Sequence, residues 1–211
     1  VELVASFNAR SDRTTVQVGF DSQWMYAATD PELLGPGETQ GKVVRARLDG
    51  SDLTTLVDGL YRPEGVAVAG GKVYFTIEGT EGKVEGPALR SVNVDGSEET
   101  TIAKTLVDIG NVAVWTPDFA YSAGVSAIAR YDTVDWQKSF VLGSGPLAPG
   151  TPIIEGLSLD GDTGLAVAST FSYGGSLHTP ATLTRWSPNG GSLITIATGL
   201  GLVFVVYGGM K

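Results

Sequence analysis

A short apolar pattern recurs along this sequence at a nearly constant spacing, and no other feature constrains the fold as strongly. Its first apolar residue lies at positions 66, 112, 157 and 203, which are steps of 46, 45 and 46 residues. A further copy begins near position 16, which is 50 residues before position 66. A fixed period of this length is typical of repeat proteins, in which each unit buries a face against its neighbour.

Each repeat contains four runs that are typical of β-strands. The apolar pattern forms the first run, and a second run rich in β-branched and aromatic residues follows it. The third run ends in turn residues, which are Asp49-Gly50-Ser51 in one repeat and Asp95-Gly96-Ser97 in the next. We predict tight hairpin turns there, because these residues tolerate the positive φ that such turns need. A fourth run closes each unit.

Four antiparallel strands in about 45 residues are typical of one blade of a β-propeller. We therefore predict an all-β fold, a β-propeller of four-stranded antiparallel blades, as a single domain over residues 1–211. Its repeats start near residues 16, 66, 112, 157 and 203. The fifth repeat contains only residues 202–207, so two blade counts stay open. The ring has five blades, closed by a strand from each end of the chain, or it is a truncated ring of six.

Two insertions interrupt the repeats between the second and third runs. Residues 30–40 are rich in Pro, Gly and Glu, and residues 171–180 are rich in Gly and Ser. Both are predicted to be exposed loops on the same face of the propeller, because they occupy the same connection.

The composition argues against several classes of partner. Lys and Arg total 14 and the formal net charge is −9. A basic surface of the kind that binds nucleic acid or an anionic membrane is therefore not expected. Cysteine is absent from the sequence, which excludes disulfides and thiolate metal sites. No apolar run reaches the roughly 20 residues that a membrane-spanning helix needs. The low charge density, with many Gly, Ser and Thr residues, leads us to expect an extracellular or cell-surface protein.

One stretch of the chain resembles a known repeat. Over residues 42–104, about a third of the chain, the sequence is similar to the YWTD and NHL families of β-propeller. The resemblance rests on Val44-Arg45-Ala46-Arg47-Leu48-Asp49-Gly50-Ser51, then on Glu64-Gly65-Val66-Ala67-Val68, and on Tyr74-Phe75-Thr76, which keeps most of the YWTD tetrapeptide. It implies the propeller architecture and identifies no ligand.

Candidate site residues lie where the first strand of a repeat begins. Glu64 and Glu155 occupy equivalent places, and Asn111 lies one position away from theirs. A propeller points such side chains at its central channel, where carboxylates can bind a divalent cation such as Ca²⁺. The arrangement resembles gluconolactonase and regucalcin-like lactonases, in which acidic and amide residues at blade starts hold a metal that polarises the lactone carbonyl.

Other residues that could carry chemistry have plainer interpretations. His178 is the single histidine and lacks a Gly-x-Ser-x-Gly elbow, so we interpret it as a polar loop residue. The segment that runs from Asp160 to Gly164 lacks the EF-hand spacing and is predicted to be a two-residue turn. The tryptophans are predicted to pack between blades rather than to stack on sugars, because their positions in the repeat differ: Trp24, Trp115, Trp136 and Trp186. We interpret three arginines as occupying the same position of the third strand: Arg47, Arg130 and Arg185. They are predicted to form ion pairs with neighbouring acids.

The resulting functional hypothesis is a non-catalytic secreted or surface propeller that binds a protein or glycan partner at the channel mouth, near Glu64, Asn111 and Glu155. No cofactor is expected in that case. The alternative is a metal-dependent hydrolase or lactonase, with a divalent cation held by Glu64 and Glu155 and acting as Lewis acid. A third interpretation is self-assembly through the strand edges that an incomplete blade exposes.

Overall fold

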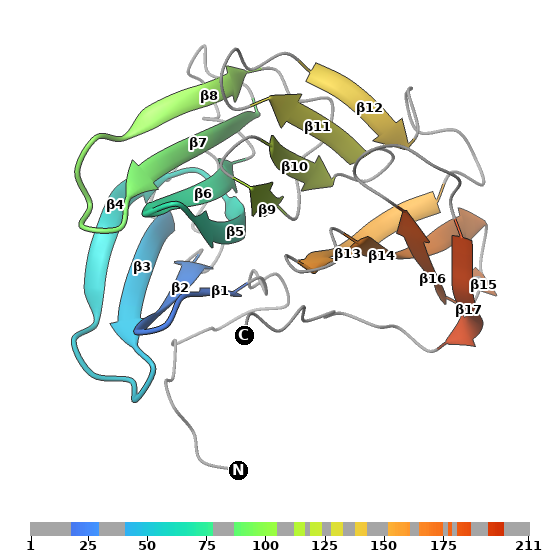
Figure 1. The fold of residues 1–211 in the computed structure, drawn as a ribbon, viewed down its shortest axis with the longest axis horizontal. Coiled ribbons are helices and arrows are strands. Elements are labelled where there is room, and N and C mark those ends of the chain that lie inside the picture. The colour runs from blue at the N-terminus through green and yellow to red at the C-terminus, as the bar shows by residue number, and fades with distance from the viewer. Residues whose placement is uncertain are drawn as a thin grey trace. The chain divides into compact units, whose positions relative to one another are not determined.

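The computed structural model describes the strands of the chain and part of their connections: residues 18–29, 41–77, 87–104, 112–116, 119–123, 128–132, 138–142, 152–160, 165–174, 177–178, 181–186 and 194–200. Side chains are described for residues 18–29, 41–77, 87–104 and 132. Every regular element in these ranges is a β-strand (Figure 1).

The strands form four antiparallel sheets, and the main strands of each sheet neighbour one another in chain order. The first sheet contains β1 (Val18–Phe20), β2 (Trp24–Thr29), β3 (Gly41–Arg47) and β4 (Thr54–Leu60). The second contains β5 (Pro63–Ala69), β6 (Lys72–Ile77), β7 (Ala88–Asn93) and β8 (Thr100–Lys104). The third contains β9 (Val112–Thr116), β10 (Phe119–Ala123), β11 (Ile128–Asp132) and β12 (Lys138–Leu142). The fourth contains β13 (Pro152–Asp160), β14 (Leu165–Gly174), β16 (Ala181–Trp186) and β17 (Ile194–Leu200), with β15 (Leu177–His178) paired to β14.

The predicted all-β fold with four-stranded antiparallel repeats is therefore confirmed. Residues 202–207 lie outside the described ranges, so the fifth repeat and the blade count stay predictions. The contacts of the chain divide it into two compact units, Val1–Ile109 and Gly110–Lys211. The first unit contains the first two sheets and the second contains the other two. The single domain over residues 1–211 also stays a prediction.

The strand registers correct three details of the sequence interpretation. Val18, rather than Val16, corresponds to Val66, because each faces the equivalent second-strand residue, Ala27 in one sheet and Phe75 in the other. Asp160 pairs with Leu165, so four residues rather than two connect β13 and β14. Part of the predicted loop 171–180 is instead a hairpin extension, because β14 continues to Gly174 and pairs with β15. The other predicted loop, residues 30–40, lies outside the described residues.

The third-strand arginines also align differently from the prediction. Arg130 faces Tyr121 and Arg185 faces Val167 on the neighbouring second strands. The residue of the first sheet at this position is Arg45, which faces Tyr26, whereas Arg47 lies two residues further along β3. The prediction that placed Arg47 with Arg130 and Arg185 was wrong because β3 carries two arginines on one face, Arg45 and Arg47, and each precedes an apolar residue.

In the first unit, the two sheets pack front to back. We define the front face of a sheet as the one that carries Tyr26 or its equivalent Tyr74, and the back face as the one that carries Ala27 or Phe75. The hydrophobic core joins the front of the first sheet to the back of the second, and β5 contacts β1 and β2. Its buried members are Tyr26, Ala28, Val43, Val57, Leu60, Val66, Val73, Phe75, Ile77, Ala88 and Val92.

The remaining two faces of this pair are buried as well. The back of the first sheet buries Met25, Ala27, Val44 and Ala46. The front of the second sheet buries Tyr74, Thr76, Leu89 and Ser91. A two-sheet sandwich leaves one face of each sheet in water. Burial on both faces, together with a front-to-back contact between neighbouring sheets, is instead typical of the stacked blades of a propeller.

Candidate functional site

The two predicted glutamates lie at the same kind of backbone irregularity. In β5, Pro63 faces Ile77 and Val66 faces Phe75, so one extra residue lies in the Glu64-Gly65 segment. In β13, Ile154 faces Thr170 and Gly156 faces Ser169, which makes Glu155 the extra residue. Both glutamates are therefore part of a β-bulge, a feature that often re-aims side chains beside functional sites.

A buried hydroxyl stabilises the first of these bulges. The Gly65 N–H donates a hydrogen bond of 2.9 Å to Thr76 Oγ1 on β6. The bulge interrupts the ladder there, and the threonine supplies an acceptor to a backbone group that is shielded from water. Ser169 occupies the equivalent position of β14, because it directly follows Ala168, which faces Leu157. The backbone that carries Glu64 is thus held by a side chain of its own sheet.

Replacing Thr76 by Val should lower the free energy of unfolding by about 1–2 kcal/mol, because it leaves the buried Gly65 N–H without this acceptor. Thr76→Ser keeps the hydroxyl and is the matched control. Urea titrations of both variants give the comparison. A valine variant as stable as the serine variant would show that the hydroxyl does not hold the bulge.

The predicted channel site itself stays a prediction. Glu64 belongs to the first unit and Glu155 to the second, and Asn111 lies just before β9, outside the described residues. Within the described ranges, no three histidine, aspartate or glutamate side chains gather as a cation site would require. Among the residues that the structure describes, no helix is long and apolar enough to span a bilayer.

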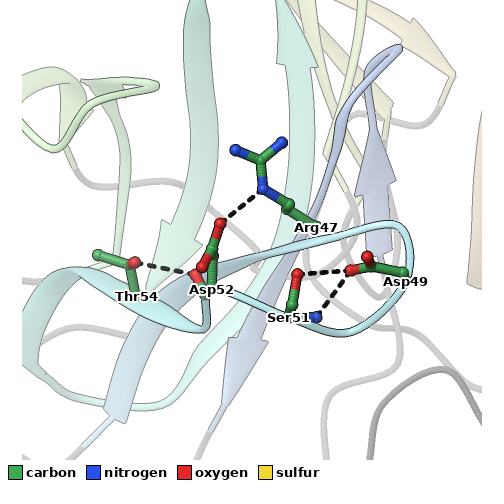
Figure 2. A network of polar contacts seen from close by, with 5 residues as sticks. All are labelled: Arg47, Asp49, Ser51, Asp52 and Thr54. Carbon is green, nitrogen blue, oxygen red and sulfur yellow. Dashed lines mark hydrogen bonds and ion pairs between the residues drawn. The ribbon is translucent and has the colours of Figure 1, made fainter.

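The turn between β3 and β4 is built by one aspartate. Asp49 Oδ1 accepts hydrogen bonds from the Ser51 N–H (2.9 Å) and the Ser51 hydroxyl (2.6 Å), as Figure 2 shows. Gly50 has a φ of 85°, which suits glycine, and its N–H bonds to the Arg47 carbonyl at 2.8 Å. Arg47 Nε in turn donates to Asp52 Oδ2 at 2.6 Å, so the predicted ion pair of Arg47 with a neighbouring acid is confirmed.

The β7–β8 turn is built in the same way. Asp95 Oδ1 accepts from the N–H and hydroxyl of Ser97 at 2.9 and 2.6 Å, and Gly96 has a φ of 90°. Both predicted Asp-Gly-Ser turns are therefore confirmed. The hydrogen bonds from serine lower the pKa of Asp49 and Asp95 below the ordinary carboxyl value. The two turns form an internal pair in which the backbone is constant and the outer side chains differ.

Arginines cover the ring of Trp24 on the front of the first sheet. The guanidinium carbons of Arg45 and Arg47 lie 4.3 and 4.8 Å from its ring centroid. Arg45 also donates a hydrogen bond to the Val94 carbonyl of the second sheet, and Trp24 packs against the core between these sheets. The predicted inter-blade packing role is thus confirmed for Trp24.

Asp21 fixes the hairpin that positions Trp24. Its carboxylate accepts hydrogen bonds from the N–H groups of Gln23 and Trp24, both at 2.8 Å, and from the Tyr26 hydroxyl at 2.6 Å. Partial burial alone raises the pKa of Asp21, but these hydrogen bonds and the charge of Arg45 outweigh it and lower the pKa. Burial, the hydrogen bond to Asp21 and the Asp21 charge raise the pKa of Tyr26.

The low pKa of Asp21 predicts a loss of stability in acid. A carboxyl group whose folded pKa lies below its unfolded pKa stabilises the fold above the unfolded value, and this contribution disappears as the pH falls through the folded pKa. Between about pH 7 and pH 3, the wild type should lose more unfolding free energy than Asp21→Asn, by less than about 1 kcal/mol because the group is partly solvated. Urea titrations at both pH values test this. Equal losses would contradict it.

The matched turns differ in what they expose. Leu48 and Leu53 of the first turn are 44% and 63% exposed. The equivalent residues of the second turn are Val94, which packs against the core, and Glu99, whose carboxylate lies 3.0 Å from Arg90. Sequence reasoning missed this surface. An alignment of the two Asp-Gly-Ser turns contained the signal, since leucine replaces glutamate at position 53.

The outer edge of the first sheet is irregular. Strand β4 carries two register shifts against β3, and Lys42 Nζ lies 3.2 Å from Asp58 Oδ2 at its end. Bulges and charges on an edge strand oppose pairing with another chain. The predicted self-assembly concerned the incomplete last repeat, which lies outside the described residues, and stays a prediction.

Comparisons with known proteins agree with the repeat and with the sheets. No family model matches the chain. An 80-residue segment is 39% identical to the low-density lipoprotein receptor-related protein 1 of Pyricularia oryzae, covering 36% of this chain and 25% of that protein. The match thus spans about a quarter of that relative's length.

Solved structures match most of the chain. A chain of a nidogen/laminin complex shows 14% identity and a TM-score of 0.57, over 88% of this chain and 80% of that one. TolB from Acinetobacter baumannii shows 11% identity and a TM-score of 0.57, over 82% and 41%. A gluconolactonase from Xanthomonas campestris shows 18% identity and a TM-score of 0.56, over 80% and 57%. The fold is propeller-like. These identities are low, so the likeness concerns the fold alone.

Proposed function

We propose that this propeller-like protein binds a protein partner outside the cell and has no catalytic activity. A solved nidogen/laminin complex is among the structures that it resembles, and a segment is similar to a protein named as a lipoprotein receptor-related protein. Both likenesses support a binding role on an extracellular scaffold. A glycan is a weaker candidate, because the one tryptophan whose side chain is described, Trp24, has its ring covered by arginines.

The observation that carries this proposal is the contrast between the two matched turns. In the first sheet the turn exposes Leu48 and Leu53 to water. In the second sheet the same turn has Val94, which packs against the core, and Glu99, which is charged. Singly exposed leucines are common on protein surfaces. Here two exposed leucines lie on one rigid turn. The matching turn of the second sheet lacks them, which shows that the fold does not require them, so they support contact with another protein.

The test is a binding screen of the full chain against a panel of purified extracellular proteins. We expect at least one saturable interaction, measured by biolayer interferometry and repeated with the partner immobilised instead. Leu53→Glu, which copies the residue of the second turn, should weaken it, whereas Val94→Ala should not. A folded chain without a saturable partner would count against the proposal.

A metal-dependent hydrolase or lactonase is the second candidate. It is supported by the β-bulges that carry Glu64 and Glu155, and by the gluconolactonase among the similar structures. Carboxylates and an amide, here Asn111, are the oxygen ligands that a hard cation such as Ca²⁺ prefers, and the cation would polarise the substrate carbonyl. Metal content by mass spectrometry tests it. Loss of stoichiometric metal in Glu64→Gln would support this candidate, and no metal in the wild type would remove it.

We also propose that the stacked sheets close into a ring of five blades, or belong to a six-bladed ring of which this chain is a part. Front-to-back packing supports it, because repeated head-to-tail contacts form rings when the rotation closes. Residues 202–207 and 1–7 would supply the closing strands in the five-bladed case. Cross-linking between cysteines introduced in those two segments would distinguish the counts.

A further inference from the structure

We infer that the β3–β4 turn is the contact surface for this protein partner, and that it receives a polypeptide segment bearing one or two carboxylates beside an apolar side chain. This inference rests on the proposed binding function and adds the position and the chemistry of the contact. The surface consists of Arg47, Leu48 and Leu53, which we call the turn surface.

Arg47 supplies the recognition of a carboxylate. Its guanidinium lies over the ring of Trp24, and its Nε is bonded to Asp52. Among the described residues, the two terminal nitrogens have no acceptor, and Figure 2 shows them directed away from Asp52. The side chain is 47% exposed. A planar guanidinium with free terminal N–H groups matches a carboxylate with two parallel hydrogen bonds.

The stacking and the ion pair also fix this arginine in advance. Ordering a free arginine side chain on binding costs conformational entropy, and that cost is smaller when the side chain is already held. Arginine and aromatic residues are enriched among the residues that dominate binding energy at protein interfaces. Arg47 stacked on Trp24 places such a pair at the protein surface. At the same position the second turn has Asn93, whose side chain bonds to Ser97 and Glu98.

The leucines supply the apolar part of the contact. Leu48 follows Arg47 directly, and its N–H bonds to the Gln23 carbonyl at 3.3 Å, which ties the turn to the neighbouring hairpin. Leu53 lies on the other arm of the turn, next to Asp52. Burying both side chains under a partner would remove apolar surface from water around the Arg47 contact, and would strengthen that contact by excluding water.

The charge of the chain limits how acidic the partner segment is. With a net charge of −9, the protein repels a long acidic run at a distance. A segment with one or two carboxylates among apolar residues avoids most of this repulsion and still fills the Arg47 site. A basic segment would leave the arginine unused and would bring two positive charges together.

The experiment titrates the labelled full chain with a defined peptide, acetyl-Leu-Glu-Leu-Phe-amide, and follows the Arg side-chain N–H and leucine methyl signals by NMR. Saturable shifts are expected at Arg47, Leu48 and Leu53. The isosteric peptide with Gln in place of Glu should bind at least about fivefold more weakly, because it loses the ionic partner. No saturation at concentrations up to about 10 mM, equal affinity for the two peptides, or shifts confined to other residues would each overturn the inference.

Variants separate the surface from the fold. Arg47→Gln should weaken the acidic peptide at least about fivefold, and Arg47→Lys should fall between it and the wild type, because lysine keeps the charge and loses the planar fork. Arg90→Gln, which removes an arginine from the second sheet, should leave peptide affinity unchanged. Circular dichroism checks that each variant is folded. An unchanged affinity in a folded Arg47→Gln variant would overturn the inference.

Failure here can be told from failure of the proposed function. A protein partner that binds the wild type and Arg47→Gln equally well would leave the binding function standing and would place its contact elsewhere. A partner that is lost with Arg47→Gln and Leu53→Glu, and retained with Arg90→Gln, would support both.

Discussion

Phe75→Ala should destabilise the protein by about 3–5 kcal/mol, which is the usual cost of deleting a buried phenylalanine ring. Phe75 is 0% exposed and lies in β6 opposite Val66 and Arg90, within the core that joins the first two sheets. Its removal leaves a cavity that the two sheets cannot close without moving relative to each other. Urea unfolding, with hydrogen exchange of the β2 and β6 amides, measures the loss in this unit.

The control for Phe75 is Phe75→Leu, which fills most of the volume and should cost less than about 1.5 kcal/mol. Both variants keep the apolar pattern of the strand, and β-propensities span only about 1 kcal/mol, so a larger difference between the variants reports packing. Equal and small losses in both would show that the front-to-back interface is not tightly packed around this ring.

Gly41→Ala should lower the free energy of unfolding by about 3 kcal/mol, at the upper end of the range for overpacking. A Cβ at position 41 would lie 2.7 Å from the Leu60 carbonyl oxygen and 2.8 Å from Pro63 Cγ, and it would collide with Pro63 Cδ as well. The proline ring is rigid and the carbonyl belongs to the backbone, so neither can move aside cheaply. The thermal midpoint and the urea midpoint should both fall.

Gly19→Ala is the matched control for Gly41→Ala. Gly19 is also a strand glycine, but the nearest atoms to an added Cβ are the Ala67 Cα and the Val68 nitrogen, both at 3.4 Å. This is the edge of ordinary contact, so the change should cost less than about 1 kcal/mol. A Gly41→Ala variant as stable as Gly19→Ala would contradict the close approach of β3 to Pro63.

Much of the fold could be predicted because its signals are local or periodic. The Asp-Gly-Ser turns are specified by three residues, and the structure has the same hydrogen bonds in both copies. The alternation along β6 places Val73, Phe75 and Ile77 on one face, which any strand must do. The alignment between repeats was harder to predict, because Arg45 and Arg47 both precede an apolar residue and Val16 and Val18 both fit the first-strand pattern. Arg47 was therefore aligned at the position of Arg45, and position 16 at that of Val18.

The candidate surface could not be predicted in the same way, because it depends on which residues other elements cover. Leu48 and Val94 follow equivalent residues in equivalent turns, yet one is exposed and the other packs against the core. The difference at Leu48 arises from packing between sheets, and a single sequence does not contain it, whereas the aligned turns do show leucine at position 53 and glutamate at position 99. The β-bulges at Glu64 and Glu155 were hidden for a related reason, since an extra residue in a strand shows only when its partner strand is known.

The front-to-back packing of the first two sheets makes any excised piece of the array self-complementary. A fragment of two such sheets would present the Tyr74 and Leu89 face at one end and the Met25 and Ala46 face at the other. Each end would fit the opposite end of a second fragment, and joining would stop only where the head-to-tail contacts close into a ring. Recombinant pieces that divide the array are therefore expected to form closed head-to-tail oligomers, whose size should stop growing with protein concentration once the ring is complete.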